Sequence, residues 1–249
     1  MEDNNILHVE NLNVYYKNIS KRLAFKKINN RKQVVYDVSF DINKGEMVGL
    51  VGESGCGKST IGKAVLGLTD DLEGTIIHKT KMPQMIFQDP KSSLNPKMKI
   101  SRILEEPLRI QGTMDKTEIH DRALQMLDLM GLHLGYAERY PHELSGGQRQ
   151  RVCTGLSLML NPGFVVADEP VSALDVTVQA QIMRLLKKVN VAMNVSMLFI
   201  SHDLKVVYQL CDRIMVMKDG YIIEQGTDEE IFYNPKEEYT KQLLKAAGI

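Results

Sequence analysis

The segment from Gly52 to Thr60, G-E-S-G-C-G-K-S-T, constrains the fold of this chain more than any other stretch. It matches the pattern G-x-x-x-x-G-K-[ST], in which backbone N–H groups and a lysine hold phosphate groups. An apolar run at 47–51 precedes it and predicts a buried strand, and residues 61–66 begin an apolar-faced helix. A glycine-rich turn without a ligand is the alternative, but it does not explain the lysine and hydroxyls at these offsets. The sequence therefore predicts a binding loop for a nucleoside triphosphate.

Each residue type in this loop has a chemical reason to be there. Glycines at 52, 55 and 57 allow positive φ angles that turn N–H groups toward phosphate oxygens, and the following helix adds its positive end. Lys58 can reach the β- and γ-phosphates, and the Ser59 hydroxyl is the expected Mg²⁺ ligand. The predicted nucleotide-contacting residues of the loop are Gly52, Glu53, Ser54, Gly55, Cys56, Gly57, Lys58, Ser59 and Thr60.

Length and composition limit what can surround the loop. A chain of 249 residues can form one large domain or two small ones. A formal net charge of +0 excludes an overall field that would attract nucleic acid or an anionic membrane. No apolar run approaches the roughly 18 residues that span a bilayer, and no N-terminal signal sequence is visible. Three scattered cysteines (Cys56, Cys153 and Cys211) do not indicate a disulfide framework or a zinc site, so a cytoplasmic protein is expected.

The first forty residues are rich in β-formers and predict strands at 6–9, 12–16 and 34–42. The basic stretch at 17–32 is predicted to be a solvated loop in preference to an anion or partner site. Tyr16 lies at the end of a predicted strand, where its ring could stack on adenine or pack in the core. The sequence leaves these two alternatives open.

Further strands are predicted at 74–77 and 84–87, and the second leads into Gln88 and a turn-rich segment. From about 100 to 145 the pattern is helical, and Asp115 with Glu118 resembles a capping box. Methionines in this part are expected in an adaptable core or a subunit interface and not in a metal site.

A second candidate anion site is the segment Leu144-Ser145-Gly146-Gly147-Gln148, which precedes a helical pattern that runs to about residue 160. A helix N-terminus with exposed N–H groups and a serine hydroxyl suits a phosphate group. Taken alone, the signal is weak, since most such turns only begin helices.

Two further buried strands are predicted, and each ends in polar residues. The run at 164–167 leads into Asp168 and Glu169, and the run at 197–200 leads into His202. Ligands of open parallel sheets lie at the carboxyl ends of strands, so these side chains are expected near the nucleotide. Asp168 suits a Mg²⁺ ligand and Glu169 a general base, whereas helix capping by both is the alternative. A hairpin is predicted around Asp219-Gly220.

The motifs occur in the order of an ABC transporter ATPase, which the whole chain resembles. They are the phosphate loop, Gln88, LSGGQ at 144–148, VVADEP at 165–170, SALD at 172–175 and His202. The resemblance implies an α/β P-loop NTPase (RecA-like) fold with an N-terminal antiparallel β subdomain and an inserted helical subdomain. The implied domain is a single one spanning 1–249, with its core and β subdomain at 1–88 and 150–249 and the helical subdomain at 89–149.

The resemblance also implies roles for individual residues, with ATP and Mg²⁺ as cofactors. Tyr16 would stack on adenine, Gln88 would sense Mg²⁺ and couple to the permease, and His202 would contact the γ-phosphate. Ser145, Gly146, Gly147 and Gln148 would complete the nucleotide site of a partner ATPase in a head-to-tail dimer, with Asp175 near that interface. The implied catalytic residues are Glu169, His202, Lys58 and Gln88, and the implied Mg²⁺ ligands are Ser59, Gln88 and Asp168.

Four longer motifs resemble those of the peptide/nickel importer subfamily, and of its second paired ATPase in particular. They are MIFQDP at 85–90, SLNP at 93–96, YPHELSGGQRQR at 140–151 and FISHDL at 199–204. The implied partners are two transmembrane permeases, a paralogous ATPase and, indirectly, an extracytoplasmic solute-binding protein, but no nucleic acid. The expected location is the cytoplasmic face of the membrane.

Two departures from the family pattern bear on this reading. Leu156 stands where the family usually has arginine, and the chain reaches Ile249 without the cysteine cluster common in peptide-importing relatives. The second feature favours nickel or a metal chelate over short peptides as the solute. An exporter ATPase, or a non-transport ATPase of DNA repair or translation, is the alternative class of function.

Overall fold

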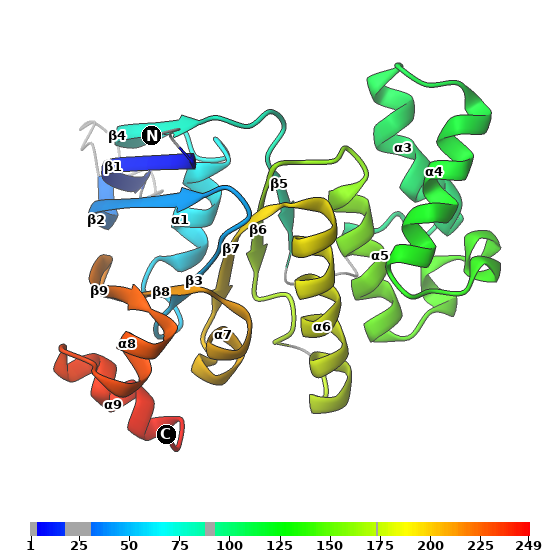
Figure 1. The fold of residues 1–249 in the computed structure, drawn as a ribbon. Helices are drawn as coiled ribbons and strands as arrows, with labels where there is room; N and C mark the ends of the chain where they lie inside the picture. The colour runs from blue at the N-terminus through cyan, green and yellow to red at the C-terminus, as the bar shows by residue number, and fades with distance from the viewer. Residues whose placement is uncertain (1–3, 18–30, 88–92, 173) are drawn as a thin grey trace, which may run out of the picture. The chain divides into compact units, whose positions relative to one another are not determined.

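The strand that leads into the phosphate loop, β3 (Met47–Val51), is buried at every residue, and the loop opens helix α1 (Lys58–Val65) (Figure 1). The structure is a computed structural model that describes residues 4–17, 31–87, 93–172 and 174–249. The chain divides into two compact units. The loop unit comprises residues 1–79 and 198–249, and the helical unit comprises residues 80–197.

An antiparallel sheet forms the N-terminal part of the loop unit, which confirms the predicted β subdomain. Its strand order is β2-β1-β4, with β1 at Asn5–Lys17, β2 at Arg31–Asn43 and β4 at Leu72–His78. The two strands predicted at 6–9 and 12–16 are parts of this single strand, because β2 and β4 pair with residues on both sides of its polar middle. Register shifts in both pairings and a φ of 52° at Asn11 absorb the irregularity.

The basic stretch at 17–32, predicted to be a solvated loop, is described only at its two ends, which belong to strands. Lys17 is the last residue of β1 and Arg31 the first of β2, while residues 18–30 lie outside the described part of the chain. The Arg31 guanidinium pairs with Asp71, lies 3.4 Å from a Glu73 carboxylate oxygen and sits 4.1 Å over the centre of the Tyr15 ring. This cation is therefore engaged within the loop unit.

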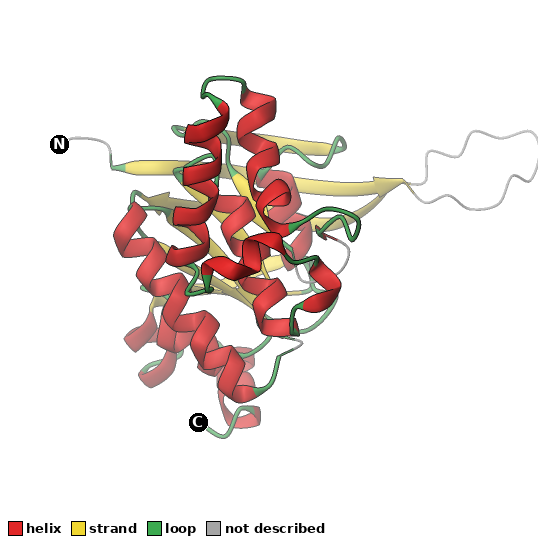
Figure 2. Cartoon of the chain, turned by 90° about the vertical axis from the view of Figure 1, so that its right-hand side faces the viewer, coloured by secondary structure: helices red, strands yellow, loops and turns green. Residues whose placement is uncertain are grey.

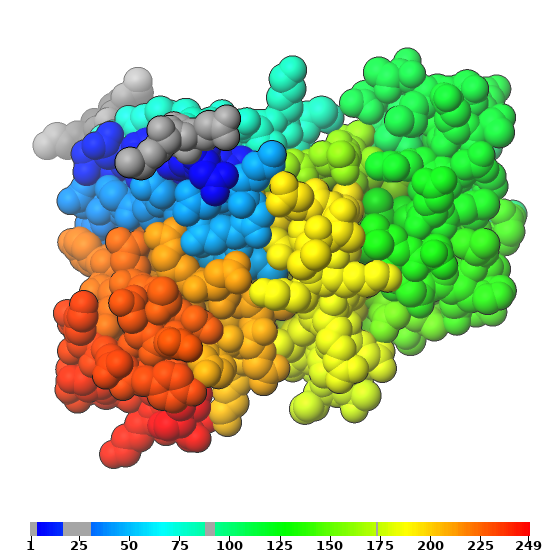
Figure 3. All heavy atoms as spheres, in the orientation of Figure 1, coloured from blue at the N-terminus to red at the C-terminus, as the bar shows by residue number. Residues whose placement is uncertain are grey.

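A second group of strands in the loop unit has the order β7-β3-β8-β9. β8 (Arg213–Lys218) runs parallel to β3 and antiparallel to β9 (Tyr221–Thr227), which confirms the predicted hairpin around Asp219-Gly220. β7 (Ser196–Ser201) leads into α7 (Leu204–Leu210), which packs on β3. The C-terminal helices α8 (Asp228–Tyr233) and α9 (Glu238–Ala246) follow β9, and α8 packs on β9. Figure 3 shows the C-terminal residues in red beside the orange residues that precede them in the chain.

The helical unit combines two parallel strands with four α-helices among its described residues. Strands β5 (Gln84–Ile86) and β6 (Phe164–Asp168) pair in register, with Ile86 opposite Ala167. The helices are α3 (Ile100–Gln111), α4 (Lys116–Leu129), α5 (Gly146–Leu158) and α6 (Val176–Met193), and short 3₁₀ helices lie at Leu134–Glu138 and Pro141–Glu143. In Figures 1 and 2, α3 and α4 lie side by side.

Two expectations for the helical unit are confirmed at the level of side chains. Asp115 and Glu118 form the predicted capping box of α4, and Ile119, Ala123 and Met126 are buried on its inner face. Within the described residues, every helix is too short or too polar to cross a membrane.

Candidate functional site

The phosphate loop has the backbone geometry that anion binding requires. Gly57 caps α1 at a φ of 114°, and a Cβ at this position would lie 2.7 Å from Met217 Cε and 3.2 Å from the Val34 carbonyl oxygen. Helix α1 has no acidic residue in its first turn and no side-chain cap. No acidic side chain of the first turn therefore competes with an anion for the positive end of the helix dipole.

Lys58 places a positive charge at the same point. Its side chain is only 5% exposed, and its ammonium donates hydrogen bonds to the carbonyl oxygens of Gly52 and Glu53, both at 2.8 Å. Burial raises the pKa of the neighbouring Cys56 thiol, despite the opposing effect of Lys58, so the thiol stays neutral. A neutral thiol adds no negative charge beside the Lys58 ammonium.

Tyr16 lies beside this loop and not in the core. Its side chain is 43% exposed, and its hydroxyl oxygen is 3.2 Å from the Thr60 hydroxyl oxygen in the first turn of α1. This exposure excludes packing of Tyr16 in the core, which is one of the two alternatives that the sequence leaves open. Stacking of this half-exposed ring on adenine stays a prediction.

His202 follows the end of β7 and is exposed. The next residue, Asp203, begins α7 by accepting a hydrogen bond from the Lys205 N–H at 2.9 Å, and its own N–H donates to the Ser201 hydroxyl oxygen at 3.0 Å. These local bonds fix the turn that presents the imidazole to solvent.

In the helical unit, Asp168 and Glu169 stand at the end of the fully buried strand β6. Asp168 is 8% exposed, and Glu169 has a φ of 47°, a strained value for a residue with a long side chain. The Glu169 carbonyl accepts hydrogen bonds from the Ser172 N–H and hydroxyl at 3.3 and 3.1 Å. Strained backbone of this kind clusters at functional sites, and here Ser172 of the SALD motif helps to hold it.

The LSGGQ segment forms the N-terminus of α5, as its pattern predicts. Ser145 caps the helix by accepting the Gln148 N–H at 3.3 Å, and the Gln148 side chain accepts the Ser145 N–H at 2.9 Å. The Gln148 amide also donates to the Tyr136 hydroxyl at 2.9 Å. The side chain of Gln148 is therefore engaged in holding the turn, while Ser145 is exposed.

The structure brings Asp175 close to this helix end. A Cβ at Gly147 would lie 2.5 Å from Val178 Cγ1, so α5 and α6 are tightly packed at this point. The Val178 N–H in turn donates to Asp175, the N-cap of α6, at 3.0 Å. Two helix N-termini, those of α5 and α6, therefore lie together in the helical unit.

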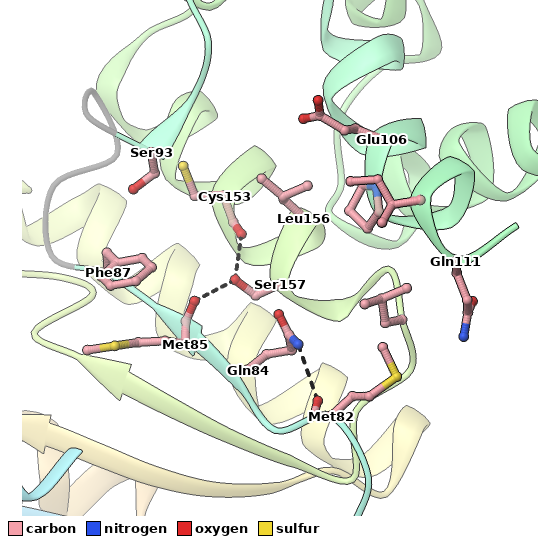
Figure 4. Close-up of a pocket in the computed structure, with 13 residues that line it drawn as sticks. Met82, Gln84, Met85, Phe87, Ser93, Glu106, Gln111, Cys153, Leu156 and Ser157 are labelled. Atoms are coloured by element: carbon pink, nitrogen blue, oxygen red, sulfur yellow. Dashed lines mark hydrogen bonds between the residues drawn. The ribbon is translucent and has the colours of Figure 1, made fainter. Parts of the chain in front are cut away.

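A groove of about 690 Å³ lies between β5, α3 and α5 within the helical unit (Figure 4). Its lining is largely apolar, and Phe87 and Ile110 are 47% and 80% exposed. Leu156, at the position where arginine is usual, forms part of one wall beside Cys153. The Ser157 hydroxyl donates to the Met85 carbonyl at 2.8 Å and ties α5 to β5 at the floor. Sequence periodicity does not reveal this groove, because its residues come from separate elements.

A smaller cavity of about 340 Å³ in the loop unit lies directly against the phosphate loop. Ser54, Gly55 and Cys56 line one side, while Lys218 and Tyr239 come from β8 and α9. The sequence offers no periodic signal that would place the C-terminal helix at the loop.

The predicted Mg²⁺ ligands carry oxygen donors of the type that this ion prefers. In the described residues, no group of three His, Cys, Asp or Glu side chains could hold a metal by itself. Mg²⁺ at phosphate sites commonly takes one or two protein ligands and completes its shell with phosphate oxygens and water. The Ser59 hydroxyl in the first turn of α1 and the Asp168 carboxylate are ligands of the required hard-oxygen type. Gln88, the third predicted ligand, lies outside the described residues.

Comparison with known proteins gives concordant matches. Residues 35–172 match the family model described as ABC transporter. The chain is 43% identical to the oligopeptide transport ATP-binding protein OppF of Haemophilus influenzae, over 98% of this chain and 78% of that protein. It is 45% identical to the dipeptide transport ATP-binding protein DppF of the same organism, over 84% of this chain and 68% of that protein. A dimeric ATP-binding cassette solved in a post-hydrolysis state with ADP and phosphate shares the fold, with a TM-score of 0.74 and 28% identity over 89% of this chain and 98% of that one.

Proposed function

Because this chain belongs to the ABC transporter family and is an ATP hydrolase that drives transport, we propose that it powers the import of short peptides. The choice of short peptides as the solute rests on sequence identity. The chain is 43% identical to a protein named for oligopeptide transport and 45% identical to one named for dipeptide transport. The chain would act at the cytoplasmic face of the membrane, together with two permease subunits and, indirectly, a solute-binding protein. We further propose that both units, from residue 1 to 249, act as one ATPase domain.

In this proposal the phosphate loop binds the triphosphate of ATP. The Lys58 ammonium keeps its hydrogen bond to the Gly52 carbonyl and turns its other N–H donors to phosphate oxygens, and the N–H groups at the start of α1 complete the cradle. Tyr16 stacks on the adenine ring, supported by its exposed position next to Thr60. Mg²⁺, when bound, neutralises the developing charge on the phosphates, and Ser59, Gln88 and Asp168 would hold it.

Hydrolysis requires a base that takes a proton from the attacking water. We assign this role to Glu169, supported by its strained backbone at the end of a buried strand and by the bracing bonds from Ser172. His202 would contact the γ-phosphate from its exposed turn.

A second ATPase subunit, paralogous to this one, would use the LSGGQ segment of this chain. The exposed Ser145 hydroxyl and the first N–H groups of α5 suit a phosphate of the partner's nucleotide. Asp175 lies near the same helix end, which supports its placement at the subunit interface.

The apolar groove of the helical unit is the surface we assign to a membrane subunit. ABC ATPases of importers work with permeases, so each needs a face on which a cytoplasmic segment of the permease can rest. Exposed Phe87 and Ile110, together with Leu156, favour an apolar segment, and Glu106 on α3 favours a basic residue at its edge.

Uptake measurements test both the direction of transport and the solute. Cells that lack this chain are supplied with labelled di- and oligopeptides or with labelled nickel. Peptide uptake should be lost and then restored by the wild-type gene. Lys63→Ala should also restore it, because Lys63 is exposed in the last turn of α1, away from the loop, whereas Lys58→Ala should not.

Loss of nickel uptake with normal peptide uptake would replace the proposed solute by a metal chelate. Unchanged uptake of both, with altered efflux, would refute import and favour an exporter. Full restoration by Lys58→Ala would contradict the role of the phosphate loop itself.

A further inference from the structure

We infer that Tyr239 of the C-terminal helix α9 is a positioning residue for the phosphate loop, fixing the peptide group that holds Lys58. The Glu53 N–H donates a hydrogen bond to the Tyr239 hydroxyl at 3.3 Å, although 186 positions separate the two residues. The Tyr239 side chain is almost fully buried, and no other residue of α9 lines the cavity beside the loop. The inference rests on nucleotide binding by the loop and not on the identity of the transported solute.

The hydrogen bond acts on one planar group. The peptide that joins Gly52 to Glu53 has its N–H on Tyr239 and its carbonyl oxygen on the Lys58 ammonium, at 2.8 Å. Since a peptide group is rigid and planar, fixing the direction of the N–H also fixes the direction of the carbonyl. Tyr239 therefore orients the acceptor that positions the phosphate-binding lysine, without touching the nucleotide.

Tyr239 can do this because α9 is itself anchored at its N-terminus. The Glu224 carboxylate of β9 accepts hydrogen bonds from the N–H groups of Lys236 and Glu237 at 2.7 and 3.2 Å and from the hydroxyl of the fully buried Thr240. Glu237, the N-cap residue, makes no side-chain capping bond. Glu224 takes over this function, and its negative charge suits the positive end of the helix.

The ring of Tyr239 has a contact of its own. The Lys218 ammonium lies 4.7 Å from the ring centre, a cation–π contact from the end of β8. The adjacent hairpin turn also contacts the loop, because the Gly220 N–H donates to the Cys56 carbonyl at 3.0 Å. The outer side of the phosphate loop is thus supported by two elements, the β8–β9 turn and α9.

The variant Tyr239→Phe tests the inference, because it removes the hydroxyl and keeps the ring, its packing and the contact with Lys218. The matched control is Tyr233→Phe at the end of α8, which also removes a hydrogen-bonded tyrosine hydroxyl, here 2.8 Å from the Tyr208 hydroxyl. For wild type and both variants, the measurements are the Kd of ATP, the melting temperature without nucleotide, and amide hydrogen exchange at Glu53 by NMR.

We expect Tyr239→Phe to raise the Kd of ATP about two- to tenfold, the usual effect of losing one hydrogen bond. Exchange at the Glu53 amide should accelerate, while Tyr233→Phe should leave both quantities at their wild-type values. A purely structural role for Tyr239 would instead lower the melting temperature and leave the Kd unchanged. That result, or unchanged exchange at Glu53, would overturn the inference, whereas failure of the wild type to bind ATP would overturn the nucleotide site itself.

Discussion

Gly147 is the point where the contact between the LSGGQ helix and α6 can be tested most directly. Replacing it by alanine would place a Cβ 2.5 Å from Val178 Cγ1, well inside van der Waals contact. Valine in a helix is nearly confined to one rotamer, so the clash cannot be relieved by a simple side-chain rotation. One of the two helices must shift, or Val178 must adopt an unfavourable conformation.

Gly146→Ala is the matched control, because a Cβ at Gly146 would meet nothing within 4 Å. Both positions lie in the first turn of α5, so the gain in helix propensity on replacing glycine is similar and cancels in the comparison. The difference between the variants then reports overpacking, about 1–3 kcal/mol. For a chain of this size that corresponds to a melting temperature roughly 3–10 °C lower for Gly147→Ala than for Gly146→Ala.

The assay is thermal and urea unfolding of both variants, in the wild-type background and with Val178→Ala. Removing the two γ-methyl groups should abolish most of the difference, which gives a double-mutant cycle for this single contact. Equal melting temperatures for the two alanine variants would refute the packing argument. A difference that persists in the Val178→Ala background would assign the cost to something other than Val178.

Two other predictions concern charge. Glu169→Gln keeps the shape of the side chain, but the amide cannot accept a proton from water. The rate of phosphate release should therefore fall by a factor of about 10²–10⁴, while ATP binding is retained. A near-normal rate of phosphate release would exclude Glu169 as the base. Glu105 is buried on α3, and its carboxylate oxygens lie 2.8 Å from a guanidinium nitrogen of Arg109 and 2.8 Å from a ring nitrogen of His120. Burial alone would raise the pKa of Glu105. The bonds to Arg109 and His120 outweigh burial and hold this pKa below its ordinary value. The resulting stabilisation is present above the unfolded-state pKa and is lost as pH falls below it, so the melting temperature should drop between about pH 5 and 3. Glu105→Gln should flatten this acid dependence, and an unchanged profile would contradict the assignment.

Some parts of this protein follow from short stretches of sequence. The phosphate loop, the capping box of Asp115 and Glu118, and the Asp219-Gly220 hairpin each depend on residues within a few positions of one another. Their geometry is set by backbone preferences and local hydrogen bonds, so spacing alone identifies them. The buried strands before Gly52 and Asp168 are equally readable, because a continuous apolar run with a polar end has few other interpretations.

The limits of sequence reasoning appear where pairing with distant strands overrides local pattern. Glu10 and Asn11 interrupt the β-forming run near the N-terminus and suggest a break. In the structure β1 continues past them as one strand with register shifts, because β2 and β4 pair with the residues before and after them. The hydrogen bonds and side-chain packing of β1 with two neighbouring strands outweigh the cost of the positive φ angle at Asn11.

The sequence by itself determined the family and the phosphate loop, and it predicted the charged groups that serve the loop. Only the tertiary structure decided that Tyr16 is exposed beside Thr60, that Leu156 lines an apolar groove, and that Tyr239 reaches the Glu53 amide. The physical reason is the same in each case. Exposure and long-range hydrogen bonds depend on which distant elements pack against a residue, and no pattern in the neighbouring sequence encodes that choice.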